Sequence, residues 1–409
     1  MAETKSMTAE EVVRYLLEEG DGLDFLRESL TWIVQQLMEA EVSELIGARR
    51  GERTDERLTH RNGYRTRPWQ TRAGELELAI PKLRRGSYFP SFLEARKRSE
   101  QALVSVIQEA YVAGVSTRKV DQVVESLGLR VSKSEVSRIC QGLDEQVEAF
   151  RQRPLEGRYP YLFLDAKVEK VRDGGRVVRK CLVLAHGVHE TGYREVIGLD
   201  VGEAETEAFW RSFLRSLVTR GLTGVELVVS DAHPGLKKAI AQVLGCAWQR
   251  CSVHFLRECL GHARREQQGM LGALLRPIFN AESGEVAREL VGAALEALRR
   301  PLPRVAELLE EAEDDLVAFY AFPSDHWRKV RSTNPLERLN REIGRRTDVV
   351  GIFPNDASLI RLAASVVIEQ NDEWLVGRRY LSAHSMEAIL NEEKERNNSR
   401  EEVLELTTA

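Results

Sequence analysis

The sequence predicts an α/β protein built on one mixed β-sheet. Three β-rich runs, YLFLDA, CLVLAHGV and REVIGLDV, follow one another from about residue 157 and are separated by short turns. The helical pattern TEAFWRSFLRSLVTRG comes next. It is followed by a fourth strand pattern in VELVVSD, a helix from Pro234 to Leu244, and a last strand pattern in CAWQRCSV. The order βββαβαβ predicts three antiparallel strands with parallel strands added to them.

Helices follow this sheet along the chain. Residues 255–326 are rich in Leu, Ala and Glu and contain no strand pattern, so they predict an all-helical insertion. A further helix begins at NPLERLNREIGRR, and another runs from about 356 to 372. The strand order is that of a ribonuclease H-like sheet, which makes the expected fold a ribonuclease H-like domain with a helical insertion. The charged tail beyond 386 is expected to be poorly ordered.

A mainly helical region with DNA-binding features precedes this domain. Residues 8–48 predict helices, with apolar side chains at helical spacing that suit a core or, less often, a dimer contact: Leu26, Leu30, Ile33 and Leu37. A basic stretch follows, in which Arg49 to Arg85 holds eleven Arg and Lys against five acidic residues. It ends in the alternating segment ELELAIPKL, which predicts a strand.

Residues 100–150 predict a helical cluster. Ser132 followed by Glu135 forms a capping box, which places the start of a helix there. The first turns of that helix carry Lys133 and Arg138, residue types that a recognition helix presents to the major groove. The same pattern also fits a helical bundle that does not bind DNA. In the basic stretch, the candidate DNA contacts are Arg61, Arg65 and Arg67 of RNGYRTR.

The formal charge of −5 first argues against a nucleic-acid partner, but the charge is unevenly distributed. Residues 1–28 carry a net charge of −5 and residues 387–409 a net charge of −4, so the middle of the chain is +4 by subtraction. A basic middle binds phosphate locally even at a moderately acidic pI. We expect neither a membrane span nor a secretory signal, and the five cysteines fit a reducing cytoplasm.

Two aspartates follow apolar strand patterns and predict a metal-dependent phosphoryl-transfer site. Asp165 ends YLFLD and Asp231 ends VELVVSD. In the expected topology these strands are adjacent and parallel, so both carboxylates reach the same edge of the sheet. Pairs of Mg²⁺ ions held by such oxygen ligands catalyse phosphoryl transfer. The alternative is that each aspartate is only a turn or cap residue. Asp200 also ends a strand pattern but is the weaker candidate, because we expect its strand to run away from this pair.

Glu337 is the candidate third acid. Its alternative role is structural, since Asn334 can cap the helix, Pro335 suits its first position, and Glu337 then occupies the capping-box position. Two considerations favour the site: the helix must return to the sheet after the insertion, and its arginines suit contacts with DNA phosphates. These arginines are Arg338, Arg341, Arg345 and Arg346. Glu342 lies about 140° further round the helix, so both glutamates cannot face one metal site.

Five ordered segments resemble the Mutator-type bacterial insertion-sequence transposases. They are YLFLDAKVEKVR, YREVIGLDVGEAETEAFWRSFLRSLVTRGL, SDAHPGLKKAI, QRCSVHF and DHWRKVRSTNPLERLNREIGRRTDVVGIFP. The resemblance runs from about residue 20 to 382 and includes RNGYRTR. It implies that Asp165, Asp231 and Glu337 form an acidic triad, that Cys251 and His254 form a Cys-x-x-His motif, and that Trp327 is the tryptophan ahead of the last acid.

The resemblance also implies an activity and its partners. It predicts a DNA transposase that binds terminal inverted repeats, nicks the DNA to expose a 3′-OH, and joins that end to a new strand. The expected cofactor is Mg²⁺, with Mn²⁺ as a substitute. The expected partners are double-stranded DNA, as element ends and target, and a second copy of the chain in a cytoplasmic, nucleoid-associated complex. The alternatives are a structure-specific nuclease on the same fold and a non-catalytic DNA-binding repressor.

Several further residues have two interpretations. Cys251, His254, Cys259 and His262 are spaced as possible zinc ligands, but we expect packing or support of the acidic site and no zinc. His233 follows Asp231 and either contacts the substrate or starts a helix. Trp327 either stacks on an unpaired base or packs in the core.

These observations divide the chain into six expected segments. They are N-terminal helices suited to dimerisation (1–48), a basic and helix-turn-helix-like DNA-binding region (49–156), the first part of the catalytic domain (157–254), a helical insertion (255–326), the completion of the catalytic domain with the third acid (327–385), and a charged tail (386–409).

Overall fold

The computed structural model describes residues 23–52, 54, 57–71, 74–93, 101–113 and 133–391. The chain divides into two units, Met1–Gly142 and Leu143–Ala409. Residues 114–132, which include part of the predicted helix-turn-helix, lie outside the described residues, as do 1–22 and 392–409. No helix in the described part of the chain is long and apolar enough to cross a membrane.

In the first unit, one long helix packs on a β-hairpin. Helix α2 (Leu23–Ile46) buries one face against strand β2 (Gly74–Leu83), which pairs antiparallel with β1 (Arg61–Thr71). The buried side chains of this helix are Val34, Met38, Val42 and Ile46. The predicted stripe was therefore partly wrong: Leu30 packs against this core, but Ile33 and Leu37 are about half exposed, at 48% and 50%.

Strand β1 corrects the expectation of a mainly helical region. RNGYRTRPWQT was described only as a basic stretch, but it pairs with the predicted strand ELELAIPKL, as in Arg65↔Ile80 and Trp69↔Leu76. Two helices follow, α3 (Gln101–Val112) and α5 (Lys133–Gln141). Helix α5 begins where the capping pattern predicts a helix start.

The second unit contains a five-stranded sheet in the order β5-β4-β3-β6-β7. Its strands are β3 (Tyr161–Asp173), β4 (Arg176–Val188), β5 (Arg194–Gly202), β6 (Leu227–Ser230) and β7 (Ala247–Arg250). The first three are antiparallel, and β6 and β7 add parallel to β3. This is the predicted succession of strands. Continuous apolar runs, buried on both faces of the sheet, explain why most of these strands could be predicted.

Strands β3 and β4 are longer than expected. They continue as a two-stranded ribbon to the pair Asp173↔Arg176, and the turn between them uses Gly174 and Gly175 at positive φ. Glycine adopts this backbone conformation without steric strain. Asp165 therefore lies within β3, opposite Leu184, and not at the strand's end as predicted.

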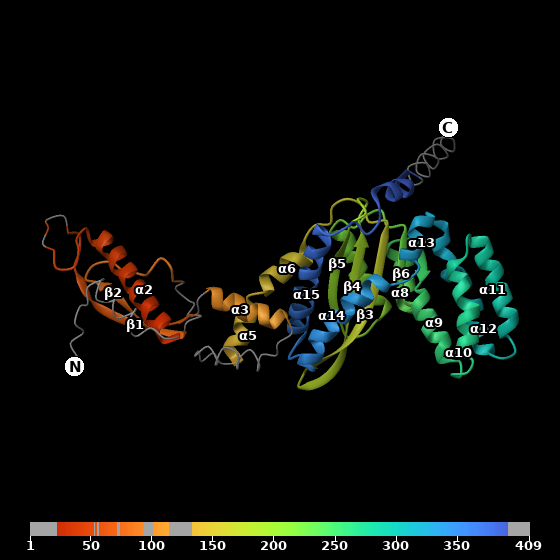
Figure 1. Cartoon of the computed structure of the whole chain (residues 1–409), viewed down its shortest axis with the longest axis horizontal. Coiled ribbons are helices and arrows are strands. Elements are labelled where there is room, and N and C mark those ends of the chain that lie inside the picture. The colour runs from red at the N-terminus through yellow and green to blue at the C-terminus, as the bar shows by residue number, and fades with distance from the viewer. Residues whose placement is uncertain are drawn as a thin grey trace. The chain divides into compact units, whose positions relative to one another are not determined.

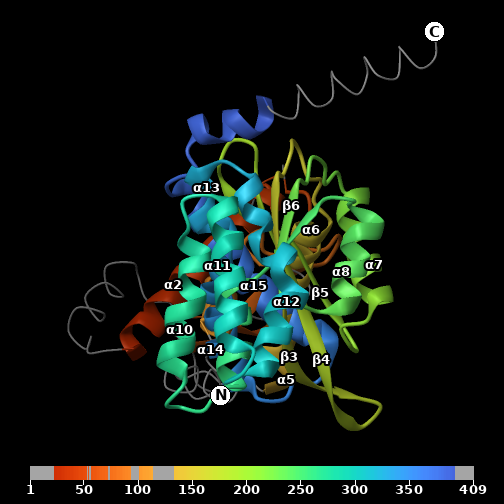
Figure 2. The same cartoon turned by 90° about the vertical axis from the view of Figure 1, so that its right-hand side faces the viewer.

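Helices cover both faces of the sheet. On one face lie α7 (Glu207–Thr219) and α8 (Pro234–Val243), which pack with side chains such as Leu162 and Val183. The other face carries α14 (Asn334–Val350) and α15 (Asp356–Val376). Figures 1 and 2 show these layers in the second unit. Helix α6 (Asp144–Gln152), predicted within the DNA-binding region, instead packs on α15 and β5.

The insertion is helical throughout, as predicted, and its apolar side chains join the core on the α14 side of the sheet. Its elements are α9 (Ser252–Gly261), α10 (Gln268–Leu275), η1 (Arg276–Asn280), α11 (Gly284–Leu298), α12 (Pro303–Val317) and η2 (Ala318–Ala321). Helix α13 (Ser324–Val330) then leads back to α14. The expected disorder beyond 386 was wrong for its first residues: 383–391 are helical, with Met386 and Ile389 buried.

Candidate active site

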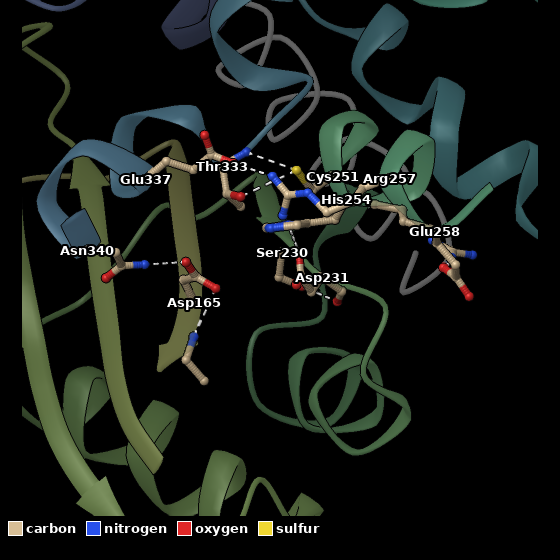
Figure 3. Close-up of polar contacts among 12 residues, drawn as sticks. Asp165, Ser230, Asp231, Cys251, His254, Arg257, Glu258, Thr333, Glu337 and Asn340 are labelled. Atoms are coloured by element: carbon tan, nitrogen blue, oxygen red, sulfur yellow. Dashed lines mark hydrogen bonds and ion pairs between the residues drawn. The ribbon is translucent and has the colours of Figure 1, made fainter. Parts of the chain in front are cut away.

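Asp165 in β3 and Asp231, which directly follows β6, lie at the same level of two neighbouring parallel strands. The last paired residues of these strands are Phe163 and Val229, and each aspartate is two positions further on. Side chains two positions apart point to the same face of a sheet, and neighbouring strands are about 4.8 Å apart. The two carboxylates therefore converge on the face that α14 covers, as Figure 3 shows.

Helix α14 places Glu337 and Asn340 over this pair. Glu337 lies in the first turn, and Asn340, three residues later on the same helix face, donates a hydrogen bond from Nδ2 to Asp165 Oδ2. Glu337 Oε1 lies 3.4 Å from a guanidinium nitrogen of Arg257. The structure does not show a capping box, because Thr333 occupies the cap position and makes no side-chain cap bond.

The environment of Asp165 suits a cation. Burial, and secondly the nearby charge of Asp231, raise the pKa of Asp165 to about 6. A positive charge between the two carboxylates would reverse this effect. Asn340 Oδ1 is also buried and accepts no hydrogen bond within the described residues. Carboxylate and amide oxygens are the ligands that Mg²⁺ prefers, so the residues present fit this ion.

The Cys-x-x-His motif connects Asp231 with the start of α14. The Cys251 backbone N–H donates to Ser230 O at 2.8 Å, directly before Asp231. The Cys251 sulfur accepts from both the backbone N–H and the hydroxyl of Thr333, each at 3.3 Å. His254 contacts Asp231 through Nδ1. The loop that carries the second acid is thereby attached to the helix that carries the third (Figure 3).

Charge within this network is set by its hydrogen bonds. The bond from His254 to Asp231, and then that to Cys251, raise the pKa of His254 to about 10, so the imidazole is protonated at neutral pH. Burial raises the pKa of the Cys251 thiol, but the bonds from His254 and Thr333 outweigh it and lower that pKa below its usual value. The cationic imidazole beside Asp231 orients that carboxylate.

The four spaced Cys and His residues do not converge. Asp231, Cys251 and His254 place ligand atoms within 4.8 Å of one another, which is a geometry that a softer cation could use. Cys259, however, is fully buried in the apolar core, and His262 is exposed at the end of α9. These four residues therefore do not form the tetrahedral zinc site that their spacing could indicate.

Sequence reasoning missed Asn340 and Glu205. Glu205 lies in the loop before α7, and burial raises its pKa, while His233 and Asp231 also act on it. The charge of Glu205 also raises the pKa of Asp165. His233 occupies the cap position of α8 without a side-chain cap bond, which places it beside the acidic group. A spacing of three residues from Glu337 could have indicated Asn340, but no local pattern marks Glu205.

Trp327 packs among aromatic side chains. Its ring centroid lies 4.6 Å from that of Tyr320 and 6.2 Å from that of Phe319, and its Nε1 donates to Phe322 O at 2.6 Å. This arrangement corresponds to the core-packing interpretation. Asp200 is also accounted for, because it lies on β5 and accepts a hydrogen bond from Arg151 at 2.8 Å. Strand β5 runs parallel to β3 with β4 between them, so the expected strand direction was wrong. Asp165 pairs with Leu184 and Leu184 with Leu199, so Asp200, one position further on, points to the other face of the sheet.

The arginines of α14 differ in exposure. Arg338, Arg341 and Arg345 are exposed, as contacts with phosphate would require. Arg346 is buried between Glu342 and Glu369, at 2.8 Å and 3.3 Å, so its prediction as a phosphate contact was wrong. Glu342, the alternative third acid, is held by Arg345 and Arg346.

The predicted DNA contacts of the first unit also differ. Arg61 is half-buried and bonded to Glu39 and Ser43. Arg65 is exposed on the hairpin, and Arg67 lies 5.1 Å from the Phe89 ring centroid. Arg138 is exposed near the end of α5, and Lys133 is the first residue of that helix.

Known proteins resemble the chain over almost its whole length. The family described as "Transposase, Mutator family" matches residues 1–377. The transposase for insertion sequence element IS1081 from Mycobacterium tuberculosis is 50% identical over 88% of this chain and 87% of its own length. The transposase for ISRM5 from Rhizobium meliloti is 41% identical (93% and 96%), and that for IS256 in transposon Tn4001 from Staphylococcus aureus is 37% identical (92% and 97%). With the resemblance and the geometry in agreement, the chain belongs to the Mutator family of transposases.

Proposed function

We propose that this transposase cuts and joins DNA strands at a ribonuclease H-like site formed by Asp165, Asp231 and Glu337. The observation that carries the proposal is the convergence of three acids from separate elements. Asp165 in β3 and Asp231 directly after β6 lie level on adjacent parallel strands. Helix α14, which carries Glu337, is bonded directly to Asp165 through Asn340 and, through Thr333 and Cys251, to the end of β6. Carboxylates brought together in this way would supply the oxygen ligands that a pair of divalent cations needs.

In this proposal the three carboxylates would hold Mg²⁺, with Mn²⁺ as a substitute. When bound, these ions would supply the charge that activates the attacking hydroxyl or water and stabilises the leaving oxygen. Asn340 orients Asp165 by its hydrogen bond, and His254 orients Asp231. Arg257 beside Glu337 is exposed and lies where a phosphate oxygen would replace its contact with the carboxylate.

The substrate proposed is double-stranded DNA carrying the element's terminal inverted repeats. The exposed basic hairpin and α5 of the first unit are the proposed end-binding surface, through Arg65, Arg67, Lys133 and Arg138. Phosphate contacts of this kind make binding weaken steeply as salt rises. Work at two ends requires at least a homodimer in the active complex.

A strand-transfer assay tests this proposal. The full-length protein is incubated with Mg²⁺, a labelled duplex carrying the sequence that flanks the gene, and a target plasmid. We compare wild type with Asp165→Asn, Asp231→Asn and Glu337→Gln. Each variant should lose cleavage and joining by at least about 10²-fold, because a negative charge facing the cations is removed. End binding should stay nearly unchanged.

Asp200→Asn is the matched control, since it changes another aspartate of the same sheet outside the site. It should cleave and join like wild type. Cleavage without joining would favour a nuclease, and binding without either would favour a repressor. Near-normal transfer by Glu337→Gln would show that the negative charge of this residue is not needed, so that it is not a ligand of the proposed cations.

A further inference from the structure

Three cationic side chains on the α14 side of the sheet pair with no carboxylate of the described residues. Arg194 is the first residue of β5, Lys329 lies in the last turn of α13, and Arg338 follows Glu337 on α14. We call these three residues the cationic cluster. Arg194 and Lys329 are half-buried, and Arg338 is exposed.

Aromatic rings hold the two half-buried cations. The Arg194 guanidinium carbon lies 4.2 Å from the Trp374 ring centroid and 5.0 Å from that of Tyr380. The Lys329 ammonium lies 5.1 Å from the Tyr380 ring centroid and donates to the backbone oxygen of the same residue. These rings fix the positions of both charges but do not neutralise them.

The cluster differs from other buried cations in the second unit. Lys180 lies between Asp173 and Asp356, at 3.0 Å and 2.8 Å, and Arg361 pairs with Asp144. Within the described residues, by contrast, no carboxylate pairs with any member of the cluster, and the Arg194 guanidinium donates no hydrogen bond. A cation removed from water ordinarily needs an anionic partner.

The pKa shifts of Lys329 and Arg194 indicate that an anion would bind favourably among these cations. Burial lowers the pKa of Lys329, and the charge of Arg194 lowers it further. Burial likewise lowers the pKa of Arg194, with Arg338 acting in the same direction and Tyr380 opposing it. The three charges therefore repel one another, and an anion among them would relieve that repulsion.

The sheet register puts the cluster on the same face as the catalytic carboxylates. Tyr161 pairs with Val188, and Val188 with Arg194, so Arg194 points to the face that carries Tyr161 and, four positions along β3, Asp165. A hydrogen bond of 2.6 Å between Tyr161 and His326 attaches α13 to this face, one turn before Lys329. Four residues of strand and two strand spacings give about 16 Å from Asp165 to Arg194.

We propose that Arg194, Lys329 and Arg338 bind the phosphodiester backbone of a DNA strand that extends from the cleavage site across this face of the sheet. The proposal rests on the proposed function of the acidic site. Guanidinium and ammonium groups are the usual partners of phosphate oxygens, and Arg338 is adjacent in sequence to Glu337. At about 3.4 Å of helix axis per nucleotide, 16 Å corresponds to about five nucleotides from the scissile phosphate.

Salt-dependent binding tests this proposal. The full-length variants Lys329→Gln/Arg338→Gln and Arg194→Gln are titrated with labelled end duplex without divalent cations, at several chloride concentrations. Each lost phosphate contact should reduce the slope of log K against log salt by about 0.9. Arg299→Gln/Arg300→Gln is the matched control, because it removes two exposed charges at the end of α11. Arg194→Lys keeps the charge and should retain most of the slope.

A second measurement locates the contact. End duplexes carrying one uncharged methylphosphonate are tested at each phosphate from two to eight nucleotides on either side of the cleavage site. A methylphosphonate about five nucleotides away should weaken binding to wild type but have no further effect in the double variant, because both changes remove the same contact.

Each remaining outcome overturns the proposal. A slope reduced no more than in the control, or additive effects at every phosphate tested, would show that the cluster does not contact DNA. In another outcome, sodium phosphate displaces the end duplex far better than sodium chloride does at the same ionic strength, and this difference is lost in Lys329→Gln/Arg338→Gln. That result would show that the cluster binds free phosphate and not DNA. If wild type fails to cleave, the proposed function has failed; if it cleaves and the cluster variants bind with an unchanged slope, only this inference has failed.

Discussion

Replacing Asp165 by asparagine should stabilise the metal-free protein. Asp165 lies within β3, half-buried beneath α14, with the charge of Asp231 nearby. Burial and this like charge raise its pKa from 3.8 to about 6, which means that the folded state disfavours the ionised carboxyl. Active sites often store such unfavourable electrostatics because a bound ligand uses them.

The magnitude follows from the change in pKa. A rise from 3.8 to about 6 corresponds to about 3 kcal/mol against the folded state once the carboxyl is ionised. Asparagine keeps one acceptor oxygen, so one of the two hydrogen bonds, from Ala166 or Asn340, is weakened at a cost of about 1 kcal/mol. The net expected stabilisation by Asp165→Asn is about 2 kcal/mol at pH 8.

The sign of the pH dependence is also fixed. Because the folded pKa is the higher one, the folded state binds more protons between pH 3.8 and about 6, and stability falls as pH rises through that window. Below it the carboxyl is protonated in both states and contributes nothing. The advantage of the asparagine variant should therefore appear above about pH 6 and disappear near pH 4.

Urea unfolding of the full chain, followed by tryptophan fluorescence in EDTA at pH 5 and pH 8, measures this difference. Asp200→Asn is the control, since loss of its partly exposed ion pair with Arg151 should cost at most about 1 kcal/mol. Adding 10 mM Mg²⁺ should stabilise wild type and Asp200→Asn, but not Asp165→Asn, by about 1.4 kcal/mol for a Kd of about 1 mM. An Asp165→Asn protein no more stable than wild type at pH 8 in EDTA would refute the reasoning.

Two further predictions concern the Cys-x-x-His network. Thr333→Val removes the hydroxyl bond to Cys251 but keeps the backbone bond, so cleavage should slow by about tenfold while end binding stays unchanged. Thr333→Ser keeps the hydroxyl and should cleave at the wild-type rate. Equal cleavage rates for Thr333→Val and wild type would contradict a positioning role. The purified protein should contain no stoichiometric zinc by elemental analysis, because Cys259 and His262 do not join the group of Asp231, Cys251 and His254; one zinc per chain, lost in Cys251→Ser, would reverse this.

The sheet was predictable because its signals are local. Each strand of the second unit alternates or is continuously apolar, and the aspartate Asp231 directly follows one of them. Strand β1 was missed because it is basic and mostly exposed, so it carries no apolar pattern until it pairs with β2. In α2 two apolar stripes overlap, and periodicity alone could not decide which one, Ile33 with Leu37 or Val34 with Met38, meets the hairpin.

The candidate site likewise contains residues that local patterns predict and residues that only tertiary contacts reveal. Asp165 and Asp231 could be placed because parallel strands bring them level, although the continuation of β3 past Asp165 depended on pairing with β4. Asn340 and Glu205 depend on tertiary contacts that no local pattern records. Arg194, Lys329 and Arg338 come from three elements, and their lack of acidic partners within the described residues is a property of the fold.

The position of Glu337 depends on bonds that attach α14 to the sheet and to Cys251, the residue after β7. Helix α14 is bonded at its start through Thr333 to Cys251 and in its middle through Asn340 to Asp165. Further along, Thr347 donates to the buried Glu169 at 2.8 Å and accepts from Lys167 at 3.0 Å, and both of these residues lie on β3. Three attachments along one helix fix its rotation and its axial position. Together with the apolar core that α14 shares with the insertion, these attachments hold the third acid near the first two.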